Sequence, residues 1–282
     1  MIEILKAIVY GIVEGITEWL PISSTGHLIL LEKLMPFGSG SMSEDFFSMF
    51  EVVIQLGAIL AVVVLFWNQI FPFHFGKDKS EKGGFVDKKI IVLWFKIIVA
   101  CVPAAVIGIL FDDFFEALFY RYEVVAIALI VFGVAFILVE NWNKGRKPRV
   151  NSLSKITYQT ALIIGIFQLI AAIFPGTSRS GATIVGALLI GVSRTVAAEF
   201  TFFLAIPVMF GASLLKLVKF GFHFTSLEAA VLFVGMVVAF AVSMLVIKFL
   251  MGYIKKHDFK VFGWYRIVLG IVVLVFFGVI FA

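Results

Sequence analysis

The sequence predicts an all-α, polytopic membrane protein with six spanning helices and two re-entrant helix pairs, arranged as an inverted-topology repeat. Three observations lead to this prediction: the overall hydrophobicity, six long apolar runs, and two interrupted apolar regions that match each other. Hydrophobic residues make up 62% of the 282 positions and charged residues 15%. Typical soluble domains contain about 45–50% apolar residues and about 25% charged residues. One soluble core cannot bury this much apolar surface, so we expect a bilayer to cover most of it.

Six runs are long and apolar enough to cross a bilayer, which takes roughly 20 residues in a helix. They lie near 46–68, 90–111, 124–141, 197–218, 228–251 and 262–281. The single cysteine, Cys101, falls inside one of these runs. Intrachain disulfides and cysteine metal sites are therefore excluded, and Cys101 is expected to be a packing residue.

Two further regions, 3–35 and 156–191, are apolar but interrupted. Proline and a Ser/Thr cluster split the first at 21–26 and the second at 175–181. A short helix would end at each proline, and another would begin after each hydroxyl cluster. Polar backbone at membrane depth is tolerated only where protein buries it or where it lines a wet cavity. We therefore expect two re-entrant pairs, each returning to the side from which it entered.

The charges of the connecting loops agree with this topology. If both broken regions re-enter, one side carries most of the basic loop residues, which are Lys77, Lys79, Lys82, Lys88, Lys89, Lys144, Arg146, Lys147, Arg149, Lys155, Arg194, Lys255, Lys256 and Lys260. The opposite loops hold mainly Glu44, Asp45, Asp112, Asp113, Glu116, Arg121, Glu123 and Lys219. The positive-inside rule makes the basic side cytoplasmic and puts both termini outside. Because the positive charge is spread over short loops, nucleic acid is not an expected partner.

The chain is expected to form one integral membrane domain, 1–282, built from two repeats at 1–145 and 155–282. Residues 11–24 align with 165–178 at a constant offset of 154. Each half has one re-entrant pair and three spans, and since three is odd, the second half is inverted relative to the first. Interrupted segments at matching positions of inverted repeats indicate a binding site at the repeat interface, near the midplane.

The first broken region contains two carboxylates, Glu14 and Glu18, which share one face of a helix because they are four residues apart. An ionisable residue within a membrane helix is costly and indicates a functional site. Mg²⁺ or Ca²⁺ would neutralise such a pair, since both ions prefer oxygen ligands. In the structural alternative, the two carboxylates pair with lysines or face lipid headgroups.

A hydroxyl cluster, Ser23, Ser24 and Thr25, follows Pro21. Capping of the second short helix explains one of these hydroxyls. A helix N-terminus also attracts phosphate. His27 lies three residues after Ser24, which would place an imidazole beside a hydroxyl, the arrangement of an activated nucleophile.

Arg179 lies in the second broken region between Ser178 and Ser180, with glycines on either side. Its planar guanidinium suits phosphate oxygens, and the glycines allow backbone amides to approach an anion. In the structural alternative Arg179 pairs with a carboxylate of the first broken region across the repeat interface. Gln55, Glu199 and Arg266 are weaker candidates for the site. Their side chains could equally well form hydrogen bonds between helices.

Residues 14–27, Glu-Gly-Ile-Thr-Glu-Trp-Leu-Pro-Ile-Ser-Ser-Thr-Gly-His, resemble the first signature of the bacterial undecaprenyl-pyrophosphate phosphatases of the bacitracin-resistance type. Residues 175–183, Pro-Gly-Thr-Ser-Arg-Ser-Gly-Ala-Thr, resemble the second signature of that family. The resemblance extends over essentially the whole chain. It implies a multi-pass hydrolase of the bacterial plasma membrane, with an outward-facing site, that converts undecaprenyl pyrophosphate to undecaprenyl phosphate and inorganic phosphate in cell-wall synthesis.

Carried over by motif position, the resemblance implies roles for seven residues. Glu14 and Glu18 would hold the divalent cation, Mg²⁺ or Ca²⁺, and would act in catalysis. Ser23, Ser24 and His27 would form the catalytic cluster, and Arg179 with Ser178 would hold the pyrophosphate. From their places in the two broken regions, Ser23, Thr25 and Ser180 are also candidate substrate-binding residues. The nucleophile is left open between a serine, a histidine and a metal-activated water.

The expected partners are a polyprenyl pyrophosphate and membrane lipids, and a homodimer is left open. The alternative function is a secondary transporter or lipid flippase with a midplane site, because inverted repeats with broken helices are also a transporter architecture. A hydroxyl and an imidazole beside an acidic pair favour hydrolysis, since a carrier needs neither.

Overall fold

The computed structural model describes residues 1–37, 42–73 and 85–280, and these ranges contain helices and no β-strand. Six helices in them are long and apolar enough to cross a membrane. They are α3–α4 (Glu44–Val53 and Gln55–Leu65), α7 (Lys88–Phe119), α8 (Tyr122–Asn143), α11 (Arg194–Phe220), α12 (Ser226–Tyr253) and α13 (Lys260–Val275), which continues in a π-helical turn at Phe276–Ile280. The predicted all-α class and the six spans are confirmed.

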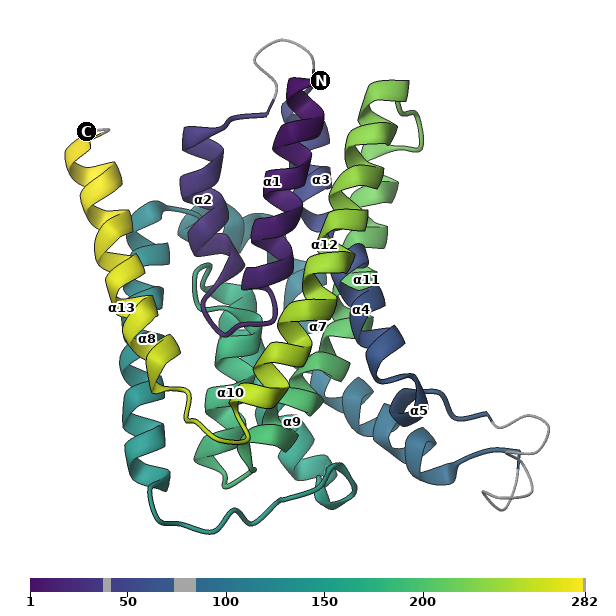
Figure 1. The fold of residues 1–282 in the computed structure, drawn as a ribbon, viewed down its shortest axis with the longest axis vertical. Coiled ribbons are helices and arrows are strands. Elements are labelled where there is room, and N and C mark those ends of the chain that lie inside the picture. The colour runs from purple at the N-terminus through teal and green to yellow at the C-terminus, as the bar shows by residue number, and fades with distance from the viewer. Residues whose placement is uncertain (38–41, 74–84, 281–282) are drawn as a thin grey trace.

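The shorter helices include two consecutive pairs, whose sequences are the two interrupted regions. They are α1 (Ile2–Thr17) with α2 (Ser24–Leu34), and α9 (Tyr158–Ile173) with α10 (Arg179–Leu189). Two further short elements are α5 (Trp67–Ile70) and a 3₁₀ turn at Leu153–Lys155. In Figure 1, α1 runs from the N-terminus to the middle of the molecule, and α2 returns to the same end. The α9–α10 pair does the same from the opposite end, so both loops lie near the centre.

Both termini lie at one end of the molecule, and the connection between α8 and α9 lies at the other (Figure 1). That connection carries five of the basic loop residues named above, Lys144, Arg146, Lys147, Arg149 and Lys155. We call this the basic end. Three lysines that were assigned to the same side, Lys77, Lys79 and Lys82, lie outside the described residues.

The first span is two helices rather than the single helix expected at 46–68. The break falls at Ile54, where the amide of Gly57 donates to the Ile54 carbonyl at 3.0 Å and closes a tight turn. The hydroxyl of Ser213, on α11, donates to the carbonyl of Val52 at 3.0 Å. A neighbouring helix therefore supplies a hydrogen bond at the break, as is usual where a membrane helix is interrupted.

The two broken pairs pack against long helices in the same way. Helix α1 packs on α12, and α9 packs on α7. A glycine makes each contact possible: a Cβ on Gly11 would lie 2.7 Å from the carbonyl oxygen of Gly235, and one on Gly165 would lie 2.3 Å from that of Ala100. Small residues allow membrane helices to approach this closely.

A Gly165→Ala variant is expected to destabilise the protein by about 1–3 kcal/mol, the usual cost of overpacking, because the obstructing atom is backbone and cannot move aside alone. Thermal unfolding in detergent measures this. Gly211→Ala is the matched control, since a Cβ there meets nothing within 4 Å and alanine favours a helix. Equal unfolding temperatures for the two variants would contradict the tight α7–α9 contact.

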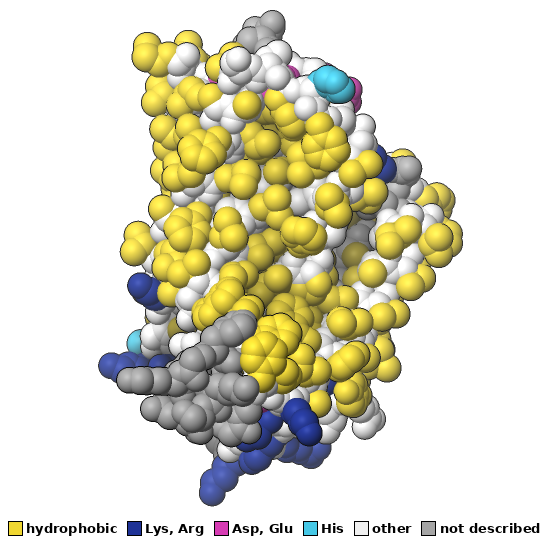
Figure 2. All heavy atoms as spheres, turned by 90° about the vertical axis from the view of Figure 1, so that its right-hand side faces the viewer, with side chains coloured by type: hydrophobic (Ala, Val, Ile, Leu, Met, Phe, Trp, Pro, Cys, Tyr) yellow, Lys and Arg dark blue, Asp and Glu magenta, His cyan; other side chains and the backbone are white. Residues whose placement is uncertain are grey.

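The outer face of the helices is strongly apolar. Large hydrophobic side chains are exposed along the spans, among them Phe95, Ile109, Phe233 and Leu245. Figure 2 shows hydrophobic side chains across the middle of one face, with most of the visible Lys and Arg gathered at the basic end. Exposed apolar surface of this extent indicates a partner of the same polarity, and for helices of this length that partner is the bilayer.

Candidate active site

The α1–α2 and α9–α10 loops meet at the centre of the molecule, and the second helix of each pair begins with a serine cap. The hydroxyl of Ser23 accepts from the amide of Gly26 at 3.3 Å, and that of Ser178 accepts from Gly181 at 3.1 Å. Both serines have positive φ, 74° and 69°. Positive φ is uncommon for a residue other than glycine and often marks a functional site.

The structural match between the loops differs from the sequence alignment by one residue. Pro21 and Pro175 are 154 positions apart, as expected, but the capping serines, Ser23 and Ser178, are 155 apart. The second loop therefore has one additional residue between its proline and its capping serine. Gly176 has a φ of +87°, and a Cβ on it would lie 2.5 Å from a backbone oxygen, so only glycine fits there. As a result, Ser24 and Arg179 occupy equivalent positions, the first residue of α2 and of α10.

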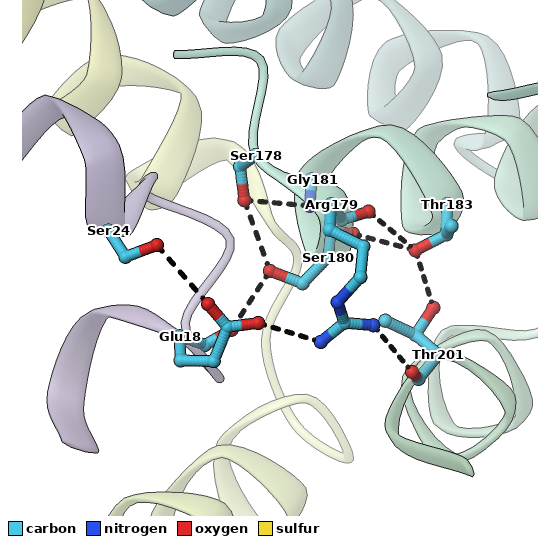
Figure 3. Close-up of polar contacts among 8 residues, drawn as sticks. All are labelled: Glu18, Ser24, Ser178, Arg179, Ser180, Gly181, Thr183 and Thr201. Atoms are coloured by element: carbon cyan, nitrogen blue, oxygen red, sulfur yellow. Dashed lines mark hydrogen bonds and ion pairs between the residues drawn. The ribbon is translucent and has the colours of Figure 1, made fainter. Parts of the chain in front are cut away.

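An ion pair joins the two loops (Figure 3). The guanidinium of Arg179 donates from Nη2 to Glu18 Oε1 at 2.8 Å, and the hydroxyl of Ser24 donates to Glu18 Oε2 at 3.2 Å. Glu18 is 7% exposed. The structure thus brings together three residues that the sequence predicted for the site, and it contains the Arg179–carboxylate pair weighed as the structural alternative.

Hydroxyl groups of α10 and α11 surround this ion pair (Figure 3). Ser180 donates to the backbone carbonyl of Glu18 at 3.2 Å, and Ser178 and Ser180 share a hydrogen bond of 3.1 Å. Arg179 Nη1 donates to the carbonyl of Thr201 at 2.9 Å, and the hydroxyls of Thr183 and Thr201 are 2.9 Å apart. Sequence reasoning missed Thr201, because it lies on α11 and nothing in its surrounding sequence connects it with the second signature.

Arg266, from α13, joins the backbone of both loops. Its guanidinium donates to the carbonyl of Pro21 at 3.3 Å, of Gly176 at 3.0 Å and of Thr177 at 2.7 Å. The residue is 0% exposed. A Cβ on Gly181 would lie 2.8 Å from Arg266 Nη1, so a glycine in α10 leaves room for the guanidinium. The sequence indicated Arg266 only as a weaker candidate, but its guanidinium joins the two loops in addition to the ion pair between Glu18 and Arg179.

His27 contacts groups other than the one expected. Its Nδ1 lies 2.7 Å from the carbonyl of Ser23, and its Nε2 lies 2.7 Å from the hydroxyl of Tyr265. A carbonyl can only accept, so Nδ1 carries a proton. The sequence predicted an imidazole beside the Ser24 hydroxyl, but the hydrogen bond of that hydroxyl goes to Glu18. Thr25 lies in the same first turn of α2 and is partly buried.

Glu14 lies one helical turn before Glu18 on α1 and is 0% exposed. Within the described residues, neither of its carboxylate oxygens has a hydrogen-bond partner. Buried, unpaired carboxylate oxygens are suitable ligands for a hard cation. The described residues contain no group of three His, Cys, Asp or Glu side chains placed to hold a metal ion. Mg²⁺ commonly binds through only one or two carboxylates together with substrate phosphates, so the residues present fit a divalent cation that binds with its substrate.

This chain is similar to known proteins over nearly its whole length. The sequence profile of a family described as "Bacitracin resistance protein BacA" matches residues 7–272. A protein of Desulfitobacterium hafniense named undecaprenyl-diphosphatase is 67% identical over 278 residues, which cover 99% of this chain and 97% of that protein. An Enterococcus faecalis protein of the same name is 64% identical over 273 residues, 97% of this chain and 96% of its own. This chain therefore belongs to the bacitracin resistance protein BacA family.

Proposed function

We propose that this chain hydrolyses undecaprenyl diphosphate to undecaprenyl phosphate and inorganic phosphate, and so recycles the lipid carrier of cell-wall synthesis. The observation that carries the proposal is the cluster at the centre of the molecule, in which Arg179 from one loop and Ser24 from the other both contact Glu18. The high identity to proteins named undecaprenyl-diphosphatase supports the substrate assignment.

The cluster contains the groups that phosphoryl transfer requires, namely a means of holding the phosphates and a positioned nucleophile. Arg179 would bind phosphate oxygens with its planar guanidinium, and the N-terminus of α10 would add backbone amides. Ser178 and Ser180, and Ser23 and Thr25 on the other loop, would contribute further polar contacts to the pyrophosphate.

Glu18 is placed to act as the general base for Ser24. The Ser24 hydroxyl already donates to Glu18 Oε2 at 3.2 Å, which is close to the distance expected for proton transfer. Ser24 would attack the terminal phosphorus as Glu18 takes its proton, and the lipid phosphate would leave. Water would then release inorganic phosphate from the serine. Direct attack by an activated water is the competing route, and His27, held by Ser23 and Tyr265, would orient α2 in either case.

The enzyme is proposed to require a divalent cation, Mg²⁺ or Ca²⁺. Glu14 and Glu18 would hold it, and when bound it would neutralise the charge on the pyrophosphate oxygens. The unpaired and buried carboxylate of Glu14 supports this assignment.

The two helix pairs are proposed to be re-entrant halves of an inverted repeat, with both termini and the site facing outward from the bacterial plasma membrane. Three observations support this: the pairs enter from opposite ends (Figure 1), they pack equivalently on α12 and α7, and the loops at one end are strongly basic. The positive-inside rule makes the basic end cytoplasmic.

The two halves differ in chemistry, which favours hydrolysis over transport. At the offset of 154, Glu14 matches Gln168 and Glu18 matches Ala172. Only the first half therefore has carboxylates at these two matched positions. Gln168 is 2% exposed, and neither polar atom of its side chain has a hydrogen-bond partner within the described residues. A carrier that binds its substrate equally from both faces would be expected to have similar residues at the matched positions of both halves. A hydrolase needs only one acidic pair.

Purified protein in detergent is expected to release phosphate from a prenyl pyrophosphate, and excess EDTA is expected to stop the release because the phosphate charge is no longer neutralised. Added Mg²⁺ or Ca²⁺ should restore it. Phosphate release is measured alongside the Glu18→Gln and Ser24→Ala variants, which should both be inactive. Undiminished release with EDTA would remove the cation from the proposal, and release by both variants at the wild-type rate would remove the site.

A further inference from the structure

A cavity of about 700 Å³ lies at the basic end, away from the cluster of Glu18 and Arg179. It lies between the end of α8 with the connection that follows, the α10–α11 loop and the end of α12. None of its lining residues belongs to the proposed active site. Ligand pockets typically measure about 300–1,000 Å³, so this cavity is large enough for a bound group of substantial size.

The lining of this cavity is strongly basic. Five cationic side chains line it, Arg146, Lys147, Arg149, Arg194 and Lys255, against one carboxylate, Glu140. Glu140 is already neutralised, because it accepts from Arg194 Nε at 2.9 Å and from the amide of Phe259 at 3.0 Å. Within the described residues, no ion pair is found for the three lining cations of the α8–α9 connection, Arg146, Lys147 and Arg149. The cavity therefore has a large excess of positive charge.

Backbone hydrogen bonds fix the walls of the cavity. The amide of Arg149 donates to the carbonyl of Gly191 at 2.8 Å, and the amide of Ser193 donates to that of Val150 at 2.8 Å. The side-chain amide of Asn143 donates to the carbonyl of Leu188 at 2.9 Å. The two backbone bonds attach the α8–α9 connection to the α10–α11 loop, and the third attaches the end of α8 to α10. The positions of the basic side chains around the cavity are therefore well defined.

Apolar side chains beside the cations indicate that the ligand has an apolar part. Trp142 is 60% exposed and Leu189 is 48% exposed, and both line the cavity. The guanidinium of Arg146 lies 4.0 Å from the centre of the Trp142 ring. Tryptophan is enriched at the level of the lipid headgroups, and Trp142 lies in the last turn of a membrane-spanning helix. A free phosphate ion would use the cations alone, whereas a phospholipid would use both kinds of side chain.

We propose that this cavity binds the phosphoryl headgroup of an anionic phospholipid from the leaflet at the basic end. Basic pockets between the cytoplasmic ends of membrane helices are suited to such headgroups, and anionic lipids are attracted to clustered Lys and Arg. Helix α10 connects the cavity to the active site, since Arg179 begins this helix and Leu189 ends it. The lipid site is a second site of the protein and does not depend on the proposed hydrolysis.

Native mass spectrometry of the detergent-purified protein tests the proposal, with dioleoyl phosphatidylglycerol, dioleoyl phosphatidylcholine and inorganic phosphate as probes. The wild type is expected to bind phosphatidylglycerol at least about tenfold more tightly than phosphatidylcholine. In the triple variant Arg146→Gln/Lys147→Gln/Arg149→Gln, binding of phosphatidylglycerol should weaken by about a hundredfold, because each basic side chain near a membrane surface contributes roughly a fivefold factor.

The matched control is Lys144→Gln/Lys155→Gln/Lys256→Gln, which removes the same charge from the same end but outside the cavity lining. It should keep the wild-type preference. If the triple cavity variant does not fold, Arg149→Gln alone should weaken binding about fivefold. Unchanged phosphatidylglycerol binding by the cavity variants would overturn the proposal. So would inorganic phosphate binding as tightly as the lipid, since the cavity would then be a site for a free anion.

Discussion

An Arg179→Ala variant is expected to lose phosphatase turnover by about a thousandfold or more. An arginine that stabilises a transferring phosphoryl group is typically worth 10³–10⁵ in rate. In this protein the loss has two causes. Arg179 would bind the pyrophosphate, and its guanidinium also forms the ion pair with Glu18 at 2.8 Å, which holds that carboxylate in place. Phosphate release from a prenyl pyrophosphate, at saturating substrate and cation, measures the effect.

Two further variants separate the roles of Arg179. Arg179→Lys keeps a point charge but loses the planar pair of donors, so turnover should be intermediate and KM raised. Arg121→Ala is the matched control, since the Arg121 side chain is 67% exposed and its ion pair with Glu123 lies at the surface, where ion pairs contribute little. Near-normal turnover in Arg179→Ala would remove this residue from the site.

The sequence was sufficient to predict the helical class and the six spanning segments, because an apolar run of about 20 residues matches the thickness of a bilayer and exceeds what a soluble core usually buries. The interruptions were also visible, since proline followed by hydroxyl residues ends one helix and starts another. The break at Ile54 was not visible. A side chain from a distant helix, Ser213, supplies the hydrogen bond there, and no local pattern in 46–68 indicates it.

Within the candidate site, the sequence predicted the residues of the signatures but not all of their contacts. Glu18, Ser24 and Arg179 come together as expected from two loops that are far apart in the chain. The partner of His27 was not predictable, because Tyr265 lies 238 positions away. The additional residue between Pro175 and the capping Ser178 was also not predictable from the sequence. It depends on the φ angles of Ser23 and Ser178, which a residue-by-residue alignment does not contain.

An Arg266→Met variant is expected to destabilise the protein by about 3 kcal/mol or more and to abolish turnover. The buried guanidinium donates to three backbone carbonyls, of Pro21, Gly176 and Thr177. A buried acceptor left without a donor costs about 1–3 kcal/mol. The loss of turnover follows because the two loops that carry Ser24 and Arg179 would no longer be tied together. Thermal unfolding and phosphate release are measured on the same preparation, with Lys248→Met, which removes a charge from the exposed face of α12, as the control.

A double-mutant cycle distinguishes this positioning role from general destabilisation. Gly181→Ala places a Cβ 2.8 Å from Arg266 Nη1, so it should displace the guanidinium and lower turnover in the same direction by a smaller factor. Because both substitutions disturb one interaction, their effects on turnover should not add. Additive effects, or full turnover by Arg266→Met at a temperature where it remains folded, would show that the guanidinium does not hold the loops in their catalytic arrangement. Arg266→Lys should recover part of the stability but little turnover, since a single ammonium is not expected to bridge carbonyls on both loops as the planar guanidinium does.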